Sequence, residues 1–122
     1  MSKTILIIDD SASIRQSTQS ALQDAGYHVI EAIDGQDGLK QLNGQKIHLI
    51  ISAVNMPQMD GITFMQEAKK RPLYQFTPVI MLTTESNQNL PPHYSSTNAK
   101  AWLTKPFRPA QMVAAVTKLI MP

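Results

Sequence analysis

The stretch ILIIDDS, residues 5–11, decides the fold class. Four consecutive aliphatic residues without polar alternation are typical of a strand that is covered on both faces. Ser11 then offers a helix N-cap, apolar residues recur at helical spacing as far as Ala25, and Gly26 stands where such a helix would end. The stretch therefore predicts a buried parallel strand that leads directly into a helix.

The same alternation recurs along the rest of the chain. Further strands are expected at residues 27–32, 47–53, 78–83 and 101–104, and further helices at 34–42, from Asp60 to Arg71, and from Pro109 onward. Strands that alternate with helices predict an α/β fold, a (βα)5 three-layer sandwich with helices on both faces of a parallel sheet.

One segment resists this pattern. Residues 84–98 should hold the fourth helix, yet they include Pro91 and Pro92, which cannot sit inside a helix without losing hydrogen bonds. Either the helix starts late, with the prolines in its first turn, or the segment is largely a loop.

Composition limits the possible functions. A chain of 122 residues and 13.5 kDa suits a single domain over residues 1–122. It has no cysteine, which excludes disulfides and thiolate metal sites. The net charge of +2 is mild and the basic residues are scattered, so nucleic acid is not expected as a partner. No apolar run reaches the roughly 18 residues of a membrane helix, and the N-terminus does not resemble a signal peptide, so we expect a cytoplasmic protein without membrane insertion.

Polar side chains gather where the predicted strands end, which is where open parallel sheets bind ligands. Asp9 and Asp10 follow the first strand, residues 53–55 end the third, Thr83 ends the fourth, and Lys105 follows the fifth. Two carboxylates suit Mg²⁺, which keeps several waters and needs few protein ligands. A lysine and a threonine beside them would hold the oxygens of a phosphoryl group.

Four motifs together resemble the response-regulator receiver family, and most closely its stand-alone, bacterial, chemotaxis-type (CheY-like) members. They are IIDDS at 7–11, NMPQMDG at 55–61, MLTTE at 81–85 and KPF at 105–107. The resemblance covers essentially the whole chain and is weakest at 87–98. It implies a flavodoxin-like strand order 2-1-3-4-5, an aspartate phosphorylated by a sensor histidine kinase with Mg²⁺ bound, and a two-component signalling role.

The resemblance also assigns roles by position. Asp9 and Asp10 match the acidic pair that binds the metal, and Asn55 matches the residue whose backbone carbonyl ligates it. Lys105 matches the family lysine, and the likeness implies a cis peptide between Lys105 and Pro106. Thr83 matches the switch hydroxyl and Trp102 the switch aromatic residue.

One position departs from the family. The phosphate-accepting aspartate should lie two residues before Asn55, and this chain has Ala53 there. A methyl group can neither attack phosphorus nor ligate a metal, and Ser52 points to the opposite face of the strand. We therefore expect no phosphotransfer at residue 53 and no enzymatic activity. We also expect weakened Mg²⁺ binding and a metal-free fold stabilised by on the order of 1 kcal/mol, because one of three crowded carboxylates is gone.

Two explanations of Ala53 stay open. It is either an engineered replacement of aspartate that fixes an inactive state, or a natural feature of a pseudo-receiver that serves as a phosphorylation-independent scaffold. The otherwise complete site favours the first, since relaxed selection would be expected to erode more than one position.

Output is expected through contact with a downstream protein target, because no output domain follows residue 122. The predicted contact surface comprises the fourth helix, the fifth strand and the last helix, with Thr83, Trp102, Lys105, Pro106, Arg108 and Met112 on or near it. We expect a monomer. Two rival functions are disfavoured: an FMN binder would not place two acids in its first loop, and a phosphoester hydrolase would need a cap domain.

Overall fold

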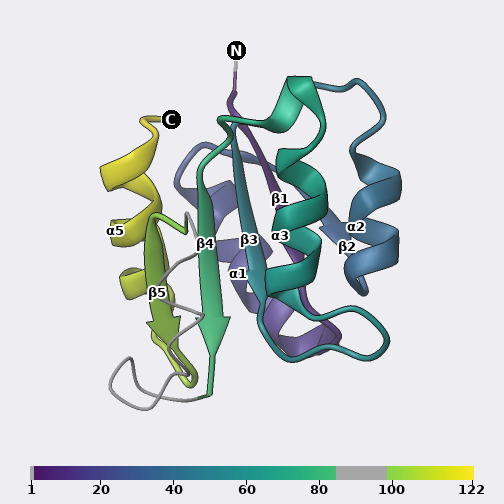
Figure 1. Cartoon of the computed structure of the whole chain (residues 1–122). Coiled ribbons are helices and arrows are strands. Elements are labelled where there is room, and N and C mark those ends of the chain that lie inside the picture. Colours follow the sequence, from purple (N-terminus) through teal and green to yellow (C-terminus); the bar gives the residue numbers. More distant parts are fainter. Residues whose placement is uncertain (1, 85–98) are drawn as a thin grey trace.

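A five-stranded parallel sheet with the order β2-β1-β3-β4-β5 forms the centre of the computed structural model (Figure 1). The strands are β1 (Thr4–Ile8), β2 (His28–Ala32), β3 (Leu49–Ala53), β4 (Val79–Thr83) and β5 (Ala101–Thr104). The helices are α1 (Ala12–Asp24), α2 (Gly35–Gln41), α3 (Gly61–Lys69) and α5 (Pro109–Leu119), with a short 3-10 helix η1 (Pro72–Tyr74). The predicted strand order is confirmed, and β2 and β5 are the edge strands.

The structure describes residues 2–84 and 99–122. The sequence left open how residues 84–98 fold around Pro91 and Pro92, and that question lies outside the described residues apart from Thr84. Among the described helices, none combines the length and the apolar character that crossing a membrane requires.

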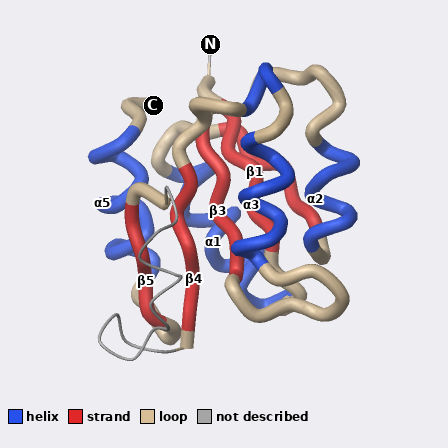
Figure 2. Tube along the Cα trace, viewed as in Figure 1, coloured by secondary structure: helices blue, strands red, loops and turns tan. Residues whose placement is uncertain are grey.

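The helices form the two outer layers predicted from the sequence. Figures 1 and 2 show α2 and α3 on one face of the sheet and α1 and α5 on the other. Successive residues of β1 serve the two cores in turn: Leu6 and Ile8 pack under α3, whereas Ile5 and Ile7 pack toward α1 and α5. Because both faces are buried, the unbroken aliphatic run at 5–8 suits this strand.

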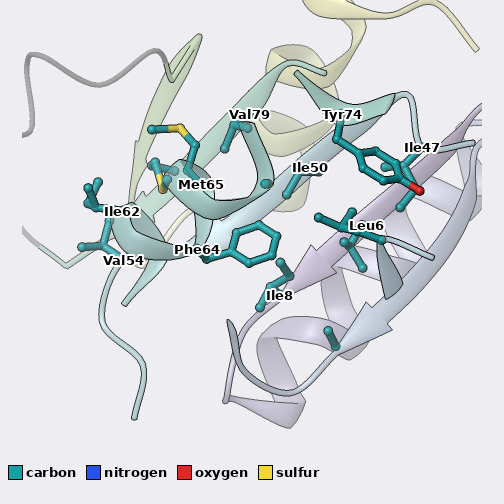
Figure 3. Packing of buried hydrophobic residues seen from close by; sticks show 14 residues of the cluster. Leu6, Ile8, Ile47, Ile50, Val54, Ile62, Phe64, Met65, Tyr74 and Val79 are labelled. Carbon is teal, nitrogen blue, oxygen red and sulfur yellow. The ribbon is translucent and has the colours of Figure 1, made fainter. Parts of the chain in front are cut away.

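The core beneath α2 and α3 is shown in Figure 3. Phe64 projects from α3 toward Ile8, and both are completely buried. Gly38 of α2 lies so close to them that an added Cβ would come within 2.6 Å of Ile8 and 2.9 Å of Phe64. The glycine therefore allows α2 to approach the sheet.

Helix starts follow the predicted caps. The Ser11 hydroxyl accepts a hydrogen bond from the Ile14 backbone N–H, and Asp60 accepts one from Thr63 at 2.7 Å. Gly26 ends the first helix region with a φ of +101°, a conformation that favours glycine. Because helix α1 starts immediately after β1, and α3 soon after β3, these caps bring the helix N-termini to the carboxyl edge of the sheet.

Candidate functional site

The carboxyl edge of the sheet collects the ends of four strands. The register aligns Ile8 of β1 with Ser52 of β3, and Ala53 with Leu82 of β4. Thr83 is aligned with Thr104, which directly precedes Lys105. The residues that follow β1 and β5 are thereby brought to the same edge as the end of β3, as the strand pattern predicted.

An ion pair joins the two outermost of these positions. The Lys105 Nζ lies 2.7 Å from Oδ2 of Asp9, and the Asp9 side chain is fully buried whereas Lys105 is 19% exposed. Among the described residues Oδ2 finds no hydrogen bond of good geometry, so the contact is a short charge pair that lies off the preferred hydrogen-bonding direction. The predicted approach of Lys105 to the acidic pair is confirmed for Asp9, while Asp10 is exposed.

Further contacts fix the position of Asp9. Its Oδ1 accepts a hydrogen bond from the Ser11 backbone N–H at 2.9 Å, and its carbonyl oxygen accepts one from Arg15 Nη1 at 2.6 Å. Arg15 is itself paired with Glu31 of β2 at 3.3 Å. Arg15 was not among the predicted site residues. A signal existed, because a cation near the start of a helix opposes the helix dipole and so suggests a specific partner.

The carboxylates at this edge fit a hard divalent cation that keeps most of its water. Asp9 offers a buried oxygen that no described donor approaches in good alignment, and Asp10 offers an exposed carboxylate. Asn55, also exposed, follows β3 two residues after Ala53. Residues 2–84 and 99–122 contain no group of three or more acidic, His or Cys side chains suited to a metal. Two carboxylates and a carbonyl are nevertheless sufficient for Mg²⁺, whereas Lys105 competes for the same Asp9 oxygen.

Ala53 ends β3 and is only 1% exposed. Its carbonyl oxygen accepts a hydrogen bond from the Ser52 hydroxyl at 3.0 Å. The first residue of α3, Gly61, packs against the same carbonyl, because a Cβ there would lie 2.0 Å from the oxygen. Ser52 is buried, and its hydroxyl would lie 3.0 Å from such a Cβ, so its side chain faces the start of α3.

The remaining predicted residues lie along β4, β5 and α5. Thr83 is buried, and its carbonyl oxygen accepts a hydrogen bond from the Lys105 backbone N–H at 2.7 Å. The Lys105–Pro106 peptide is cis, as predicted. Trp102 is half-buried on β5 and packs against the core, whereas Pro106 and Arg108 are exposed.

Met112 does not belong on the partner surface. It is fully buried between α5 and the sheet, packed with Val116. The prediction that Met112 lies on or near the partner surface is wrong as regards exposure, because the helical spacing that places it on the apolar stripe of α5 turns it inward. The same spacing in the sequence also indicates the buried face of that helix, and that prediction is confirmed.

The structure describes two of the three histidines, and one of them makes a hydrogen bond to the backbone. His48 Nδ1 accepts a hydrogen bond from the Thr4 backbone N–H at 2.9 Å. Burial lowers the pKa of His48 below its usual 6.5, and the nearby Lys46 and Lys3 lower it further. His28 is exposed on β2, and His93 lies outside the described residues.

Comparison with known proteins adds a family match. The profile of the response regulator receiver domain matches residues 5–117. A Rhizobium etli protein named "Probable chemotaxis protein CheY" is 35% identical over 113 residues, which covers 92% of this chain and 88% of the relative. The Bacillus subtilis transcriptional regulatory protein PhoP is 33% identical, and there the match covers 98% of this chain but 49% of the relative.

Solved structures agree with these matches. The chemotaxis response regulator CheY4 of Vibrio cholerae is 38% identical, with a TM-score of 0.92, over 98% of this chain and all of the other. The chain thus spans nearly the full length of the chemotaxis proteins and about half the length of the transcriptional regulator.

Proposed function

The chain belongs to the response regulator receiver domain family of two-component signalling, and from this membership we propose that it is a chemotaxis-type receiver that does not accept a phosphoryl group at residue 53. The methyl group of Ala53 has no lone pair for attack on phosphorus. The observation that carries the proposal is the buried Asp9–Lys105 contact at the same edge. Through this contact, Lys105 supplies a positive charge to the acidic site in the absence of phosphate and metal.

The charge at this edge supports the same proposal. With Ala53, the negative groups are Asp9 and Asp10 and the positive group is Lys105, so the net charge of these three side chains is −1. An aspartate at residue 53 would add a third carboxylate, which the other two would repel in the absence of metal. The Ala53 protein is therefore expected to hold a single arrangement of this site.

We propose that Mg²⁺ binds weakly to the carboxylates of Asp9 and Asp10, with the Asn55 backbone carbonyl as a further ligand. When bound, the ion would neutralise negative charge on oxygens at this edge. Its affinity is lowered by the absence of a carboxylate at residue 53, and further by Lys105, which occupies the Asp9 oxygen best suited to the metal.

Output is proposed to come through protein contacts rather than catalysis. A sensor histidine kinase and a downstream target are the partner classes that family membership suggests, and Trp102, Pro106 and Arg108 lie on the accessible part of β5 and its connection to α5. We expect the protein to act as a monomer and without nucleic acid. A second candidate is a natural pseudo-receiver scaffold, with which the Asp9–Lys105 pair is compatible because the pair forms without phosphate.

The test restores the missing carboxylate. The Ala53→Asp variant and the unaltered protein are incubated with acetyl phosphate and Mg²⁺, and intact mass is measured. One added phosphoryl group is expected on Ala53→Asp alone. Ala53→Asn is the matched control, since it has the size of aspartate without a nucleophilic oxygen, and it should stay unmodified. A phosphoryl group on the Ala53 protein would refute the proposal.

The same variants test the metal. Calorimetric titration with Mg²⁺ should show tighter binding to Ala53→Asp than to Ala53→Asn or to the unaltered protein. Equal affinities in all three would remove residue 53 from the metal site.

A further inference from the structure

A groove opens at the amino edge of the sheet, opposite the site described above. Its volume is about 510 Å³, and it lies between the loop that leads into β3 and the segment that joins η1 to β4. In Figure 1 this edge is at the top of the molecule, where the strands begin. The receiver site at the carboxyl edge does not account for this groove.

The groove is lined mainly by apolar side chains, and two of them are unusually exposed. Leu73 is 71% exposed and Phe76 is 87% exposed. Ile47, Pro72 and Pro78 line the same groove. Large apolar side chains that gather around a concave surface mark an interaction site more often than single exposed ones do.

The two walls of the groove are held together by hydrogen bonds. The buried Tyr74 hydroxyl donates to the Gln45 carbonyl oxygen at 2.7 Å and accepts from the Gly44 backbone N–H at 3.0 Å. Arg71 Nη1 donates to the carbonyl oxygens of Leu39 and Leu42, each at 3.0 Å. The groove is therefore already formed without a partner, which reduces the ordering that binding would require.

Lysines line the groove and a neighbouring hollow. Lys46 lines the groove directly, and a second hollow of about 330 Å³ on the other side of Phe76 is lined by Lys69 and Lys100. In the part of the chain that the structure describes, no acidic residue lines either hollow. Lys69 donates to the Thr77 carbonyl oxygen, and burial lowers its pKa, with the nearby Lys100 lowering it further. Within residues 2–84 and 99–122, none of these three lysines forms an ion pair.

We propose that this groove binds a protein segment that combines large apolar side chains with carboxylates. The apolar side chains would pack against Leu73, Phe76 and Pro72, and the carboxylates would meet Lys46 and Lys100. This surface is independent of residue 53 and of phosphorylation, so it is available to a partner in every state of the receiver site.

The lining favours a peptide over the other possible occupants. A nucleic acid backbone would gain little from the aliphatic and proline side chains of the groove. Among the described residues that line it, Lys46 is the only lysine or arginine, and His48 is weakly basic, so few phosphates could be neutralised there. A second copy of the chain that met this groove with Asp9, Asp10, Asp34 and Asp60, which lie at the opposite edge of the sheet, would stack head to tail and leave an open chain of molecules. An acidic, apolar peptide matches both the apolar lining and the surrounding charge.

The experiment selects binders from a random dodecapeptide phage library against the whole protein and measures the recovered peptides by fluorescence anisotropy. Peptides rich in Leu, Phe, Asp and Glu are expected. Their affinity should fall about tenfold or more for Phe76→Ser and for Lys46→Glu combined with Lys100→Glu. The matched controls are Ile33→Ser and Lys40→Glu, an exposed apolar residue and an exposed lysine elsewhere, and neither should change the affinity.

Three results would overturn the proposal. The first is that no peptide is enriched, or that enriched peptides bind Phe76→Ser and Ile33→Ser equally. The second is that a labelled oligonucleotide binds and Phe76→Ser abolishes its binding while the peptides fail. The third is self-association in sedimentation velocity that Phe76→Ser abolishes, which would assign the groove to a second copy of the chain. All of these surface residues are exposed, and unfolding curves of the variants confirm that folding is retained.

Discussion

The carboxyl edge and the amino edge of the sheet differ in how their charged side chains are paired. At the carboxyl edge, the fully buried Asp9 is neutralised by Lys105, and Arg15 is paired with Glu31. At the amino edge, Lys46 and Lys100 have no acidic partner among the described residues and lie beside exposed apolar side chains. The buried charge at one edge is therefore paired within the molecule, whereas the lysines at the other edge have no acidic partner among the described residues and are available to one.

Helix direction explains much of this difference. The helices run opposite to the strands, so their N-termini lie at the carboxyl edge and their C-termini at the amino edge. Acidic caps such as Asp34 and Asp60 stand at helix starts, while Lys69 lies in the last turn of α3 and Lys118 in that of α5. Each placement complements the helix dipole. Local helix chemistry thereby contributes to the difference in charge between the two edges, although Arg15 near the start of α1 and Asp24 at its end run against this trend.

The largest expected effect comes from removing the cation that pairs with Asp9 at the carboxyl edge. Lys105→Met should lower the free energy of unfolding by about 3 kcal/mol, because it leaves the buried Asp9 carboxylate without a cation. Urea unfolding followed by circular dichroism measures the loss. The double variant Asp9→Asn with Lys105→Met should recover most of it, since the buried charge is then gone.

The control for that prediction is the corresponding change at the amino edge. Lys46→Met should alter the free energy of unfolding by less than about 0.5 kcal/mol, because Lys46 is exposed and forms no ion pair among the described residues. Similar losses for Lys46→Met and Lys105→Met would show that the two edges do not differ in this respect.

A second prediction compares glycines at the two edges. Gly61→Ala should cost about 3 kcal/mol, because the new Cβ would lie 2.0 Å from the Ala53 carbonyl oxygen and that backbone is held in β3. Gly44→Ala should cost about 1 kcal/mol, because its φ of +102° is unfavourable for alanine although no atom of the described residues lies within 4 Å of the new Cβ. Thermal unfolding of both variants gives the two costs, and a larger cost at Gly44 would contradict the packing described for residue 53.

The side chains that meet at the carboxyl edge could be predicted because the ends of the strands can be recognised in the sequence. An aliphatic run followed by Asp9 and Asp10, and a later strand followed by Lys105, sufficed to bring acid and amine together without any contact information. The prediction failed at Met112. Its position on the apolar stripe of the last helix required a buried side chain, whereas a place on the partner surface required an exposed one, and the side chain is buried.

The amino edge was not predictable in the same way. Lys46, Lys69 and Lys100 are far apart in the chain and were interpreted as scattered charges, and only the parallel topology gathers them. Leu73 and Phe76 lie in a connection whose apolar residues carry no periodicity, so the sequence does not distinguish the buried Tyr74 from the exposed Phe76 beside it. Connections are placed by tertiary packing, which local patterns do not encode.

The smallest expected effect concerns the pH response of the amino edge. The folded protein resists protonation of His48 because burial, Lys46 and Lys3 all lower its pKa below 6.5, and protonation would remove the Nδ1 acceptor used by Thr4. As the pH falls below about 6.5, the unfolded chain takes up a proton at His48 that the folded chain does not, so the free energy of unfolding decreases. Above that pH the histidine is neutral in both states and contributes no pH dependence.

Replacing His48 by a residue that does not titrate measures this contribution. His48→Asn keeps a hydrogen-bond acceptor, so its urea midpoints between about pH 5 and pH 8 should fall less steeply on acidification than those of the unaltered protein. His28→Asn, at an exposed position on β2, is the matched control for the replacement of a histidine by asparagine. A constant difference between His48→Asn and the unaltered protein at all pH values would mean that neither burial nor the nearby Lys46 and Lys3 lower the pKa of His48 in the folded protein.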